Sequence, residues 1–512
     1  DPFSRAKAQG RKPSEMIAEG VKQVDASMGA DPGLQAELRR DLGEIQLSMG
    51  DRAAAVVTLK HAWEQQIQLS GEDSAASAAA QALYASALLQ SGDAKQAEPL
   101  LRGALDRLRA TLGPDHLRTV DAEIVLARLE LMTNHDDEAL KVLQHGIDVY
   151  STVYGPDAIE LVPRLTALSG QYVEMSRFEE SNKLSRRALR IVEQRNGPDH
   201  VRAIIPHTQI ADALRYQQKY AEALPEMQAA VRIARSQLPA SNPIIAGVLI
   251  RYGDLLRRMQ RYDEAEQVFA EGVAKLQGSG SGEYAQMLQV YGTLASARGE
   301  YALASERFRK SIQVFRKATG ESTFTWLTAL LLIDSLGQDG QLVEADKLAE
   351  EAAGVFAGIT KEDSYERGYL NGTVGYLRWR QRRFADSIAP FRHCLKVQIQ
   401  TYGEQHPEVA RMRVALARSL LAIGDADSRM EAGTLIEQAY PVIEKADAGT
   451  AALGVALLVR AELRLDAGEA TGAQQDIDAA LPSLQGKGLD RERERRMAAN
   501  LSQRIKRMPA IR

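Results

Sequence analysis

The chain has 512 residues, a formal net charge of -4, 45% hydrophobic and 26% charged residues, and only 5% aromatic residues. The near-neutral charge excludes a general attraction to nucleic acid or to anionic lipid. The sequence has no apolar run of about 18 residues and therefore predicts no membrane-spanning helix. Scarce aromatic residues and abundant alanine favour closely packed helices over a core built between sheets.

Residues 1–33 are interpreted as a linker followed by an N-terminal capping helix. Ser14 is placed to cap this helix, whose apolar residues share one side: Ile17, Val21, Val24 and Met28. The chain opens at Asp1 without an initiator methionine, so we expect it to be a piece of a longer protein.

Small residues then recur at spacings of 39 to 45, most often 42, along most of the chain. These anchor residues are Ala55, Ala97, Ala139, Ser181, Ala223, Ala265, Ala304, Ala345, Ser387, Ala432 and Ala473. A second small residue follows each anchor by seven positions, as Ala62 follows Ala55. A helical unit repeated in this way predicts a solenoid, whose units bury their apolar faces only against their neighbours.

One repeat, residues 116–157, illustrates the unit. An apolar stripe predicts a first helix, and a second helix is expected to begin at Asp136. Gly155, Pro156 and Asp157 should end it, because glycine adopts the left-handed C-terminal conformation and proline cannot continue a helix. The sequence thus predicts about eleven helix pairs over residues 34–485.

The turn between the two helices has a recognisable pattern, clearest in Arg261-Tyr262-Asp263-Glu264-Ala265 and repeated in Lys219-Tyr220-Ala221-Glu222-Ala223. This pattern resembles the tetratricopeptide repeat family, in a long 42-residue form similar to kinesin light chains. The resemblance implies an all-α, right-handed superhelical solenoid with capping helices at both ends. It also implies that a protein or peptide ligand binds in a concave groove lined by the first helix of each pair.

Two clusters on the inner face are the candidate ligand-binding residues. Repeats five and six contribute Asp212, Arg215, Tyr216, Arg251, Asp254 and Arg258. Forked guanidinium groups beside carboxylates suit a peptide that has both acidic and basic groups. We expect the arginines to hold carboxylates of the ligand and the aspartates to orient them. The alternative is a solvated face whose charges pair with one another.

Repeat nine contributes the second cluster, Tyr376, Trp379 and Arg380, which combines a large contact area with a fixed charge. We expect Tyr376 and Trp379 to anchor an apolar side chain of the ligand. The alternative is aromatic packing between neighbouring helices.

No catalytic, metal or cofactor signature is found in the sequence. The histidines form no HExxH pair and no Cys-His zinc pattern, so we predict no metal site, no cofactor and no enzymatic activity for this chain. Cys394, the single cysteine, occupies a repeated small position and is expected to be buried and unreactive.

Residues 486–512 are predicted to form a charged capping helix with an apolar edge at Leu489, Met497, Leu501 and Ile505. We expect its charged face to be solvated. The alternative is that its arginines contact an acidic partner.

The opening segment has a second resemblance, carried by Asp1-Pro2-Phe3-Ser4-Arg5-Ala6, by residues 16–20 and by residues 31–38. It is similar to the junction between kinase and repeats in some bacterial transmembrane serine/threonine protein kinases. This implies a periplasmic sensor domain of an inner-membrane kinase, without membrane contact of its own, and it allows a homo-oligomer. A bacterial regulator with a DNA-binding head and a repeat tail is a competing parent protein. The alternative function is that of a cytoplasmic scaffold that assembles a complex.

Overall fold

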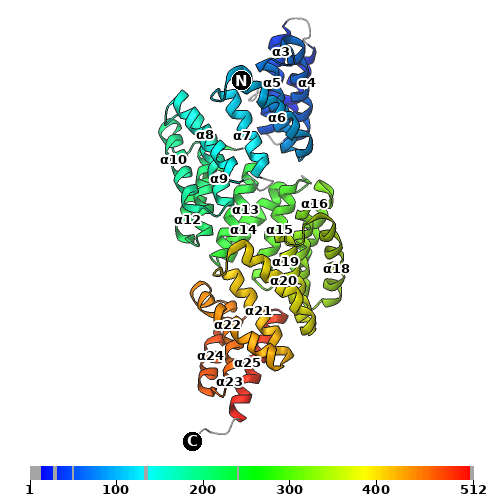
Figure 1. Cartoon of the computed structure of the whole chain (residues 1–512), viewed down its shortest axis with the longest axis vertical. Coiled ribbons are helices and arrows are strands. Elements are labelled where there is room, and N and C mark those ends of the chain that lie inside the picture. Colours follow the sequence, from blue (N-terminus) through cyan, green and yellow to red (C-terminus); the bar gives the residue numbers. More distant parts are fainter. Residues whose placement is uncertain are drawn as a thin grey trace. The chain divides into compact units, whose positions relative to one another are not determined.

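The computed structural model describes residues 13–26, 31–48, 51–131, 136–238, 242–278 and 280–507. The first part of the predicted junction, residues 1–12, and the side chain of the predicted cap Ser14 lie outside this description. The described secondary structure is entirely helical (Figure 1). None of the helices described is both long enough and apolar enough to cross a membrane.

The chain forms two compact units, Asp1–Leu255 and Leu256–Arg512. The first unit contains α2 (Pro13–Ala26), α3 (Pro32–Ser48), α4 (Arg52–Ser70), α5 (Ala75–Gln90), α6 (Ala94–Leu112), α7 (Leu117–Leu131), α8 (Asp136–Tyr154), η1 (Ile159–Leu161), α9 (Val162–Glu174), α10 (Phe178–Asn196), η2 (Val201–Ala203), α11 (Ile204–Tyr216), α12 (Tyr220–Gln237) and most of α13 (Pro243–Arg258).

The second unit begins within α13. It continues with α14 (Tyr262–Leu276), α15 (Gly282–Ala297), α16 (Tyr301–Thr319), α17 (Thr323–Gln338), α18 (Leu342–Ile359), α19 (Tyr365–Arg380), α20 (Phe384–Tyr402), α21 (Pro407–Ile423), α22 (Ala426–Ala446), α23 (Ala451–Asp466), α24 (Ala470–Ala480), η3 (Leu481–Leu484) and α25 (Leu489–Arg507).

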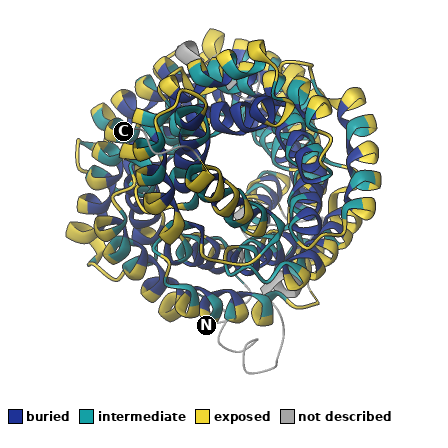
Figure 2. Cartoon of the chain, turned by 90° about the horizontal axis from the view of Figure 1, so that it is seen from below, coloured by how far each residue is buried: buried dark blue, intermediate teal, exposed yellow. Residues whose placement is uncertain are grey.

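The helices from α3 to α24 form eleven consecutive pairs among the described residues, preceded by α2 and followed by α25. The predicted all-α solenoid of about eleven helix pairs is therefore confirmed. Each anchor residue lies on the second helix of its pair, and all eleven anchors are 0% exposed. Figure 2 shows in dark blue how the buried residues concentrate on particular sides of the helices.

The reason for small side chains at these positions is the close approach of neighbouring helices. At Gly146, seven residues after the anchor Ala139, an added Cβ would lie 2.8 Å from Cδ1 of Ile124. Glycine allows this contact, whereas the Cβ of any other residue would already be too close to Ile124; other repeats have alanine, serine, cysteine or glycine at the corresponding position. The repeated small residues thus define where the two helices of a pair meet.

The boundaries of the repeat over residues 116–157 also follow the sequence. α8 begins at Asp136 and ends at Tyr154, as predicted. Gly155 has a φ of 96° and its N–H donates to the carbonyl oxygen of Ser151 at 3.0 Å. This left-handed conformation closes the helix without strain because glycine has no Cβ.

Cys394 belongs to a core cluster of the second unit that also contains Phe391 and Leu416. It is 1% exposed, and burial raises the pKa of its thiol to about 12. A thiol protonated at neutral pH is a poor nucleophile, so Cys394 fits the predicted packing role.

Candidate functional site

The predicted cluster of repeats five and six lies on α11 and α13. Arg215 donates from Nε and Nη2 to Oδ1 of Asp212, at 3.2 and 3.1 Å, and from Nη1 to Oδ2 of Asp254 at 3.5 Å. Arg251 donates from Nε to Oδ2 of Asp212 at 2.9 Å and from Nη1 to the carbonyl oxygen of Gly247 at 3.1 Å. The structure therefore joins four of the predicted residues in one network centred on Asp212.

The two arginines of this network differ in exposure. The Arg215 side chain is 10% exposed, whereas that of Arg251 is 47% exposed. Burial acts to lower the pKa of Arg215, but Asp212, Tyr216 and Asp254 outweigh it and hold the pKa above its usual range. Arg215 is thus committed to internal pairing, as in the alternative of a self-paired face. The guanidinium of Arg251 can reach a ligand.

Tyr216 and Arg258 complete this predicted cluster. Tyr216 is 52% exposed and stacks on Phe178, with ring centroids 5.4 Å apart. Cζ of Arg215 lies 4.2 Å from the centroid of the Tyr216 ring. Arg258 is exposed at the end of α13 and belongs to the second unit. An oriented, half-open ring beside an arginine is a suitable contact surface for a peptide.

The cluster of repeat nine lies on α19, inside the packed second unit. Tyr376 meets Phe391 edge-on, with ring centroids 5.1 Å apart, and burial raises the pKa of Tyr376 to about 12. Trp379 is 7% exposed, and Cζ of Arg418 lies 3.7 Å from its ring centroid. These aromatic contacts are those of the packing alternative. Ligand binding by Tyr376, Trp379 and Arg380 stays a prediction.

The C-terminal helix α25 covers this cluster. Arg380 donates from Nε and Nη2 to the two carboxylate oxygens of Asp490, at 2.9 and 2.8 Å, and from Nη2 to Oδ1 of Asp334 at 2.7 Å. Nη1 of Arg493 donates to the carbonyl oxygen of Trp379 at 3.1 Å. The predicted ligand-binding arginine therefore binds a carboxylate of its own chain.

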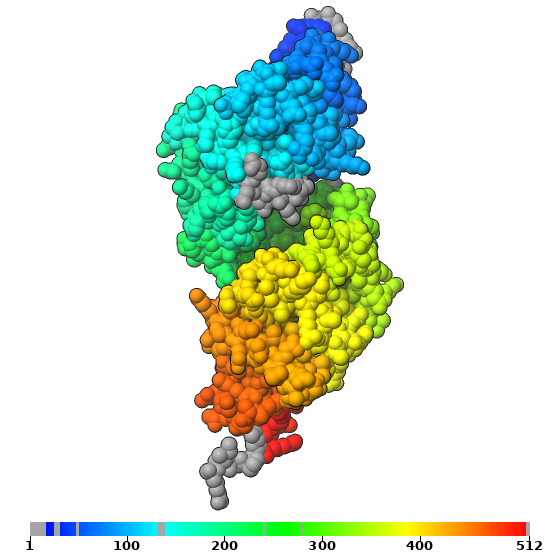
Figure 3. Space-filling view, viewed as in Figure 1, coloured from blue at the N-terminus to red at the C-terminus, as the bar shows by residue number. Residues whose placement is uncertain are grey.

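The expectation that the charged residues of the C-terminal helix are solvated is wrong for two acidic residues of α25, whereas Glu492 and Arg496 are exposed as expected. Asp490 is 5% exposed and Glu494 is 3% exposed. In the space-filling view, red atoms of the C-terminal helix are visible below the orange helices (Figure 3). The acidic residues are buried because arginines of the preceding repeats face them.

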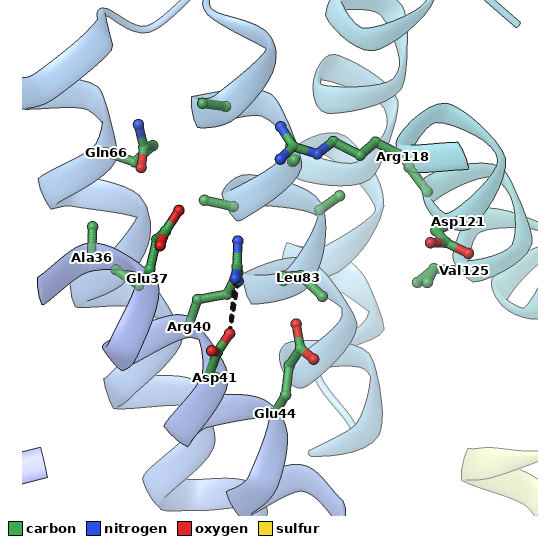
Figure 4. Close-up of a pocket in the computed structure, with 16 residues that line it drawn as sticks. Ala36, Glu37, Arg40, Asp41, Glu44, Gln66, Leu83, Arg118, Asp121 and Val125 are labelled. Carbon is green, nitrogen blue, oxygen red and sulfur yellow. Dashed lines mark hydrogen bonds and ion pairs between the residues drawn. The ribbon is translucent and has the colours of Figure 1, made fainter. Parts of the chain in front are cut away.

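The structure also contains a site that the sequence analysis missed. A cavity of about 410 Å³ lies in the first unit, among α3, α4, α5 and α7. Figure 4 shows charged side chains of α3 on one side and those of α7 on the other. The charged residues that line it are Glu37, Arg40, Asp41, Glu44, Arg118 and Asp121, and the alanines include Ala36, Ala62, Ala76, Ala79, Ala80 and Ala122.

The charges around this cavity are partly paired. Nη2 of Arg40 lies 2.9 Å from Oδ1 of Asp41, and Asp121 accepts a hydrogen bond from the hydroxyl of Tyr150 at 2.8 Å. Burial raises the pKa of Glu44, with Arg40 opposing and Asp41 and Asp121 adding to the effect. The cavity therefore combines an alanine surface with charged side chains, one of them the Glu44 carboxyl of raised pKa, and suits a ligand with both polar and apolar groups.

The sequence feature that accompanies this cavity is a high proportion of small side chains. The segment Ala75–Gln90 contains alanine at half of its positions, and several of these alanines line the cavity. A search for charged and aromatic clusters does not detect space left by small side chains. An alanine-rich first helix, compared with the first helices of other repeats, was the available clue.

Among the described residues, no group of three or more His, Cys, Asp or Glu side chains could hold a metal ion.

The repeats match the tetratricopeptide repeat family over residues 76–152, 164–236 and 244–317, and a second tetratricopeptide repeat pattern matches residues 374–408. Together these segments make up about half of the chain. The chain belongs to the tetratricopeptide repeat family. This fold is typically non-catalytic and serves protein interaction, which fits the prediction that the chain is not an enzyme.

Several solved structures share the fold at low identity. A Rap protein complexed with Competence and Sporulation Factor is 16% identical, covers 69% of this chain and 99% of its own, and has a TM-score of 0.45. The apo form of RapI is 17% identical over 55% of this chain and 97% of its own, with a TM-score of 0.43. A Podosopora anserina putative kinesin light chain is 16% identical over 39% and 94%, with a TM-score of 0.34. No curated protein matches the sequence.

Proposed function

We propose that this chain binds a peptide segment of a partner protein along the first helices of its first unit. The observation that carries the proposal is the cavity among α3, α4, α5 and α7, with its alanine surface and charged rim. The half-exposed guanidinium of Arg251, on the first helix of repeat six, supplies a further contact for a carboxylate of the peptide. Ligand sites commonly combine an apolar surface with a few oriented polar groups in this way.

Filling the cavity tests this proposal. Ala79 is half-buried in the cavity wall, so Ala79→Trp should occupy the space that the peptide needs. Ala53, exposed on α4 and absent from the lining, provides the matched control Ala53→Trp. Peptides selected from a displayed random library by the wild-type chain should bind Ala79→Trp at least about tenfold more weakly, a loss of about 1.4 kcal/mol. They should bind Ala53→Trp unchanged. Equal binding to all three proteins would place the ligand elsewhere.

We further propose that this binding domain is the periplasmic part of a bacterial inner-membrane serine/threonine kinase. The similarity of residues 1–38 to the junction in such kinases supports it. A β-lactamase reporter fused to the C-terminus of the full native gene product should confer ampicillin resistance, because the reporter acts in the periplasm. The residues encoded upstream of Asp1 should include a kinase and an apolar span.

The second candidate is a cytoplasmic scaffold, favoured by the tetratricopeptide fold taken without the junction. It predicts no resistance from the same fusion, together with reporter activity in the cytosolic fraction. The two candidates therefore give opposite results in one experiment.

A further inference from the structure

The C-terminal helix α25 docks onto helices that are remote from it in sequence. Nε2 of Gln338 donates to Oδ2 of Asp490 at 2.9 Å across 152 positions, and the hydroxyl of Tyr301 donates to the carbonyl oxygen of Lys487 at 3.3 Å across 186 positions. Gly488 approaches so closely that an added Cβ would lie 2.6 Å from Cε2 of Tyr301. The start of α25 is therefore held by repeats seven and eight, far from the end of the stack.

Two carboxylates of α25 meet two arginines from consecutive repeats. Asp490 and Glu494 are four residues apart and project from the same face of the helix. Arg380 of α19 binds Asp490 through two hydrogen bonds, and Nη1 of Arg418 of α21 donates to Oε1 of Glu494 at 3.1 Å. The arginine pair thus matches the spacing of acidic residues one helical turn apart.

All four charged side chains are buried. The side chains alone are 2% exposed for Arg380, 7% for Asp490, 7% for Arg418 and 3% for Glu494. Buried charges are costly unless they are paired, so this surface is complementary to acidic groups. A helix from another protein could present the same pair of carboxylates to this surface.

The electrostatic complementarity between α25 and this surface is incomplete. Nε of Arg418 is buried and has no hydrogen-bond partner within the described residues. Burial raises the pKa of Glu494 although Arg418 and Arg491 oppose the shift. Burial also lowers the pKa of Arg493, and the nearby charges of Arg380, Arg382 and Arg418 add to this effect. A buried donor without an acceptor is a cost that a better-matched helix would avoid.

Two open pockets lie beside α25. A cavity of about 710 Å³ lies beside it, bordered by Trp379, Arg418 and Arg493. A second cavity of about 160 Å³ is bordered by Tyr376, Asp490 and other residues of the same surface. Both spaces are open to solvent, so the surface around α25 is not filled by this helix.

The two halves of α25 are held by different forces. In the second half, Ala498 and Leu501 are 1% and 3% exposed and belong to an apolar cluster with Leu458 and Ile477 of α23 and α24. This apolar contact covers the end of the stack, as a capping helix should. The charged first half is not needed for that purpose, so its docking calls for another explanation.

We propose that the groove formed by α17, α19 and α21 recognises a helical segment of a partner protein with two carboxylates four residues apart, and that the first half of α25 occupies it as an internal competitor. This site belongs to the second unit and is separate from the peptide cavity proposed above. Arg380 and Arg418 bind the two carboxylates, and the ring of Trp379 lines the groove beside Arg418. A partner helix binds by displacing Asp490 and Glu494.

Competition with a synthetic peptide of residues 486–507 tests the proposal in the full chain. The double variant Asp490→Ala/Glu494→Ala removes the internal carboxylates and should bind the labelled peptide saturably in fluorescence anisotropy. The wild-type chain should bind it at least about tenfold more weakly, because the tethered helix competes at a high effective concentration. Adding Arg380→Ala and Arg418→Ala to the double variant should abolish binding.

Two controls distinguish recognition of the carboxylate spacing from general electrostatic attraction. In the first, the peptide has Glu494 and Arg495 exchanged, so its composition is unchanged but the two carboxylates are five residues apart. It should bind at least about tenfold more weakly, since its second carboxylate leaves the face that meets Arg418. In the second, Ala79→Trp in the first unit should leave binding of the 486–507 peptide unchanged. This control keeps the present inference distinguishable from the proposed peptide cavity.

Hydrogen exchange of the wild-type chain gives a measurement that does not depend on the variants folding. Excess 486–507 peptide should speed amide exchange in residues 489–496 and leave residues 497–507 unchanged. Unchanged exchange in 489–496 at saturating peptide, or equal binding of the exchanged peptide, would overturn the proposal. In that case α25 is a permanent cap.

Discussion

Two arginine–carboxylate networks in this protein differ in where their partners come from. In the first unit, Arg215 and Arg251 pair with Asp212 and Asp254, all on helices of adjacent repeats. In the second unit, Arg380 pairs with Asp334 of the adjacent repeat and also with Asp490, 110 positions away. The first network needs only neighbouring repeats, whereas the second is complete only when α25 is docked. The first can therefore serve as a fixed surface, and the second as an exchangeable one.

Removing Arg380 should have the largest effect. Arg380→Ala leaves Asp490 buried without its bidentate partner, so we expect the second unit to lose about 3–5 kcal/mol of stability. Hydrogen exchange at increasing urea concentration, which reports the two units separately, measures this loss. The control is Arg383→Ala, which breaks an exposed pair with Asp386 and should cost less than about 1 kcal/mol. Equal losses in the two variants would contradict the view that Arg380 anchors α25.

Removing Arg215 should have an intermediate effect on the first unit. Asp212 keeps its bond to Arg251 in the variant Arg215→Ala, but one side of a nearly buried carboxylate loses its donors. We expect a loss of about 1–3 kcal/mol in the same exchange measurement. A loss as large as that of Arg380→Ala would mean that the two networks are equally dependent on a single arginine.

The pH dependence of docking should distinguish the two carboxylates of α25. Burial raises the pKa of Glu494 above its usual 4.5, so stability falls as pH rises from 4.5 through the raised value. Burial acts to raise the pKa of Asp490 too, but Arg380 outweighs it and lowers the pKa below 3.8. The contribution of Asp490 is therefore full above pH 3.8 and is lost as pH falls through the lower value.

Thermal melts of Glu494→Gln and wild type between pH 4 and 7 check this sign. The melting temperature of the variant should increase relative to that of the wild type as pH rises, since the variant has no carboxyl group at position 494 to ionise. A constant difference across this window would show that Glu494 titrates normally.

The smallest effect on stability is expected at the exposed arginines of the first predicted cluster. Because Arg251 is half-exposed and Arg258 is exposed, the double variant Arg251→Ala/Arg258→Ala should lose less than about 1 kcal/mol of stability. Its affinity for the peptides selected by the wild-type chain should fall at least about tenfold, measured by calorimetry. Unchanged affinity with an intact fold would leave these arginines as a solvated face.

Much of the fold could be predicted from the sequence because contacts in a repeat stack are local and periodic. Ala265 and Ser387 illustrate this: their positions in the period predicted burial, and both are 0% exposed. The site was readable only in part. The sequence placed Asp212 and Arg251 on facing helices, but it did not reveal that Arg215 is committed to internal pairs.

The sequence by itself determined the helix pairs, their boundaries and the absence of recognisable catalytic motifs, because each depends on residues within one or two repeats. Tertiary structure alone decided the place of α25 and the cavity among α3, α4, α5 and α7. Asp490 gives no periodic signal that Arg380 is its partner, since the contact joins segments 110 positions apart. A cavity, likewise, is the space that remains after all side chains have packed, and no single segment specifies it.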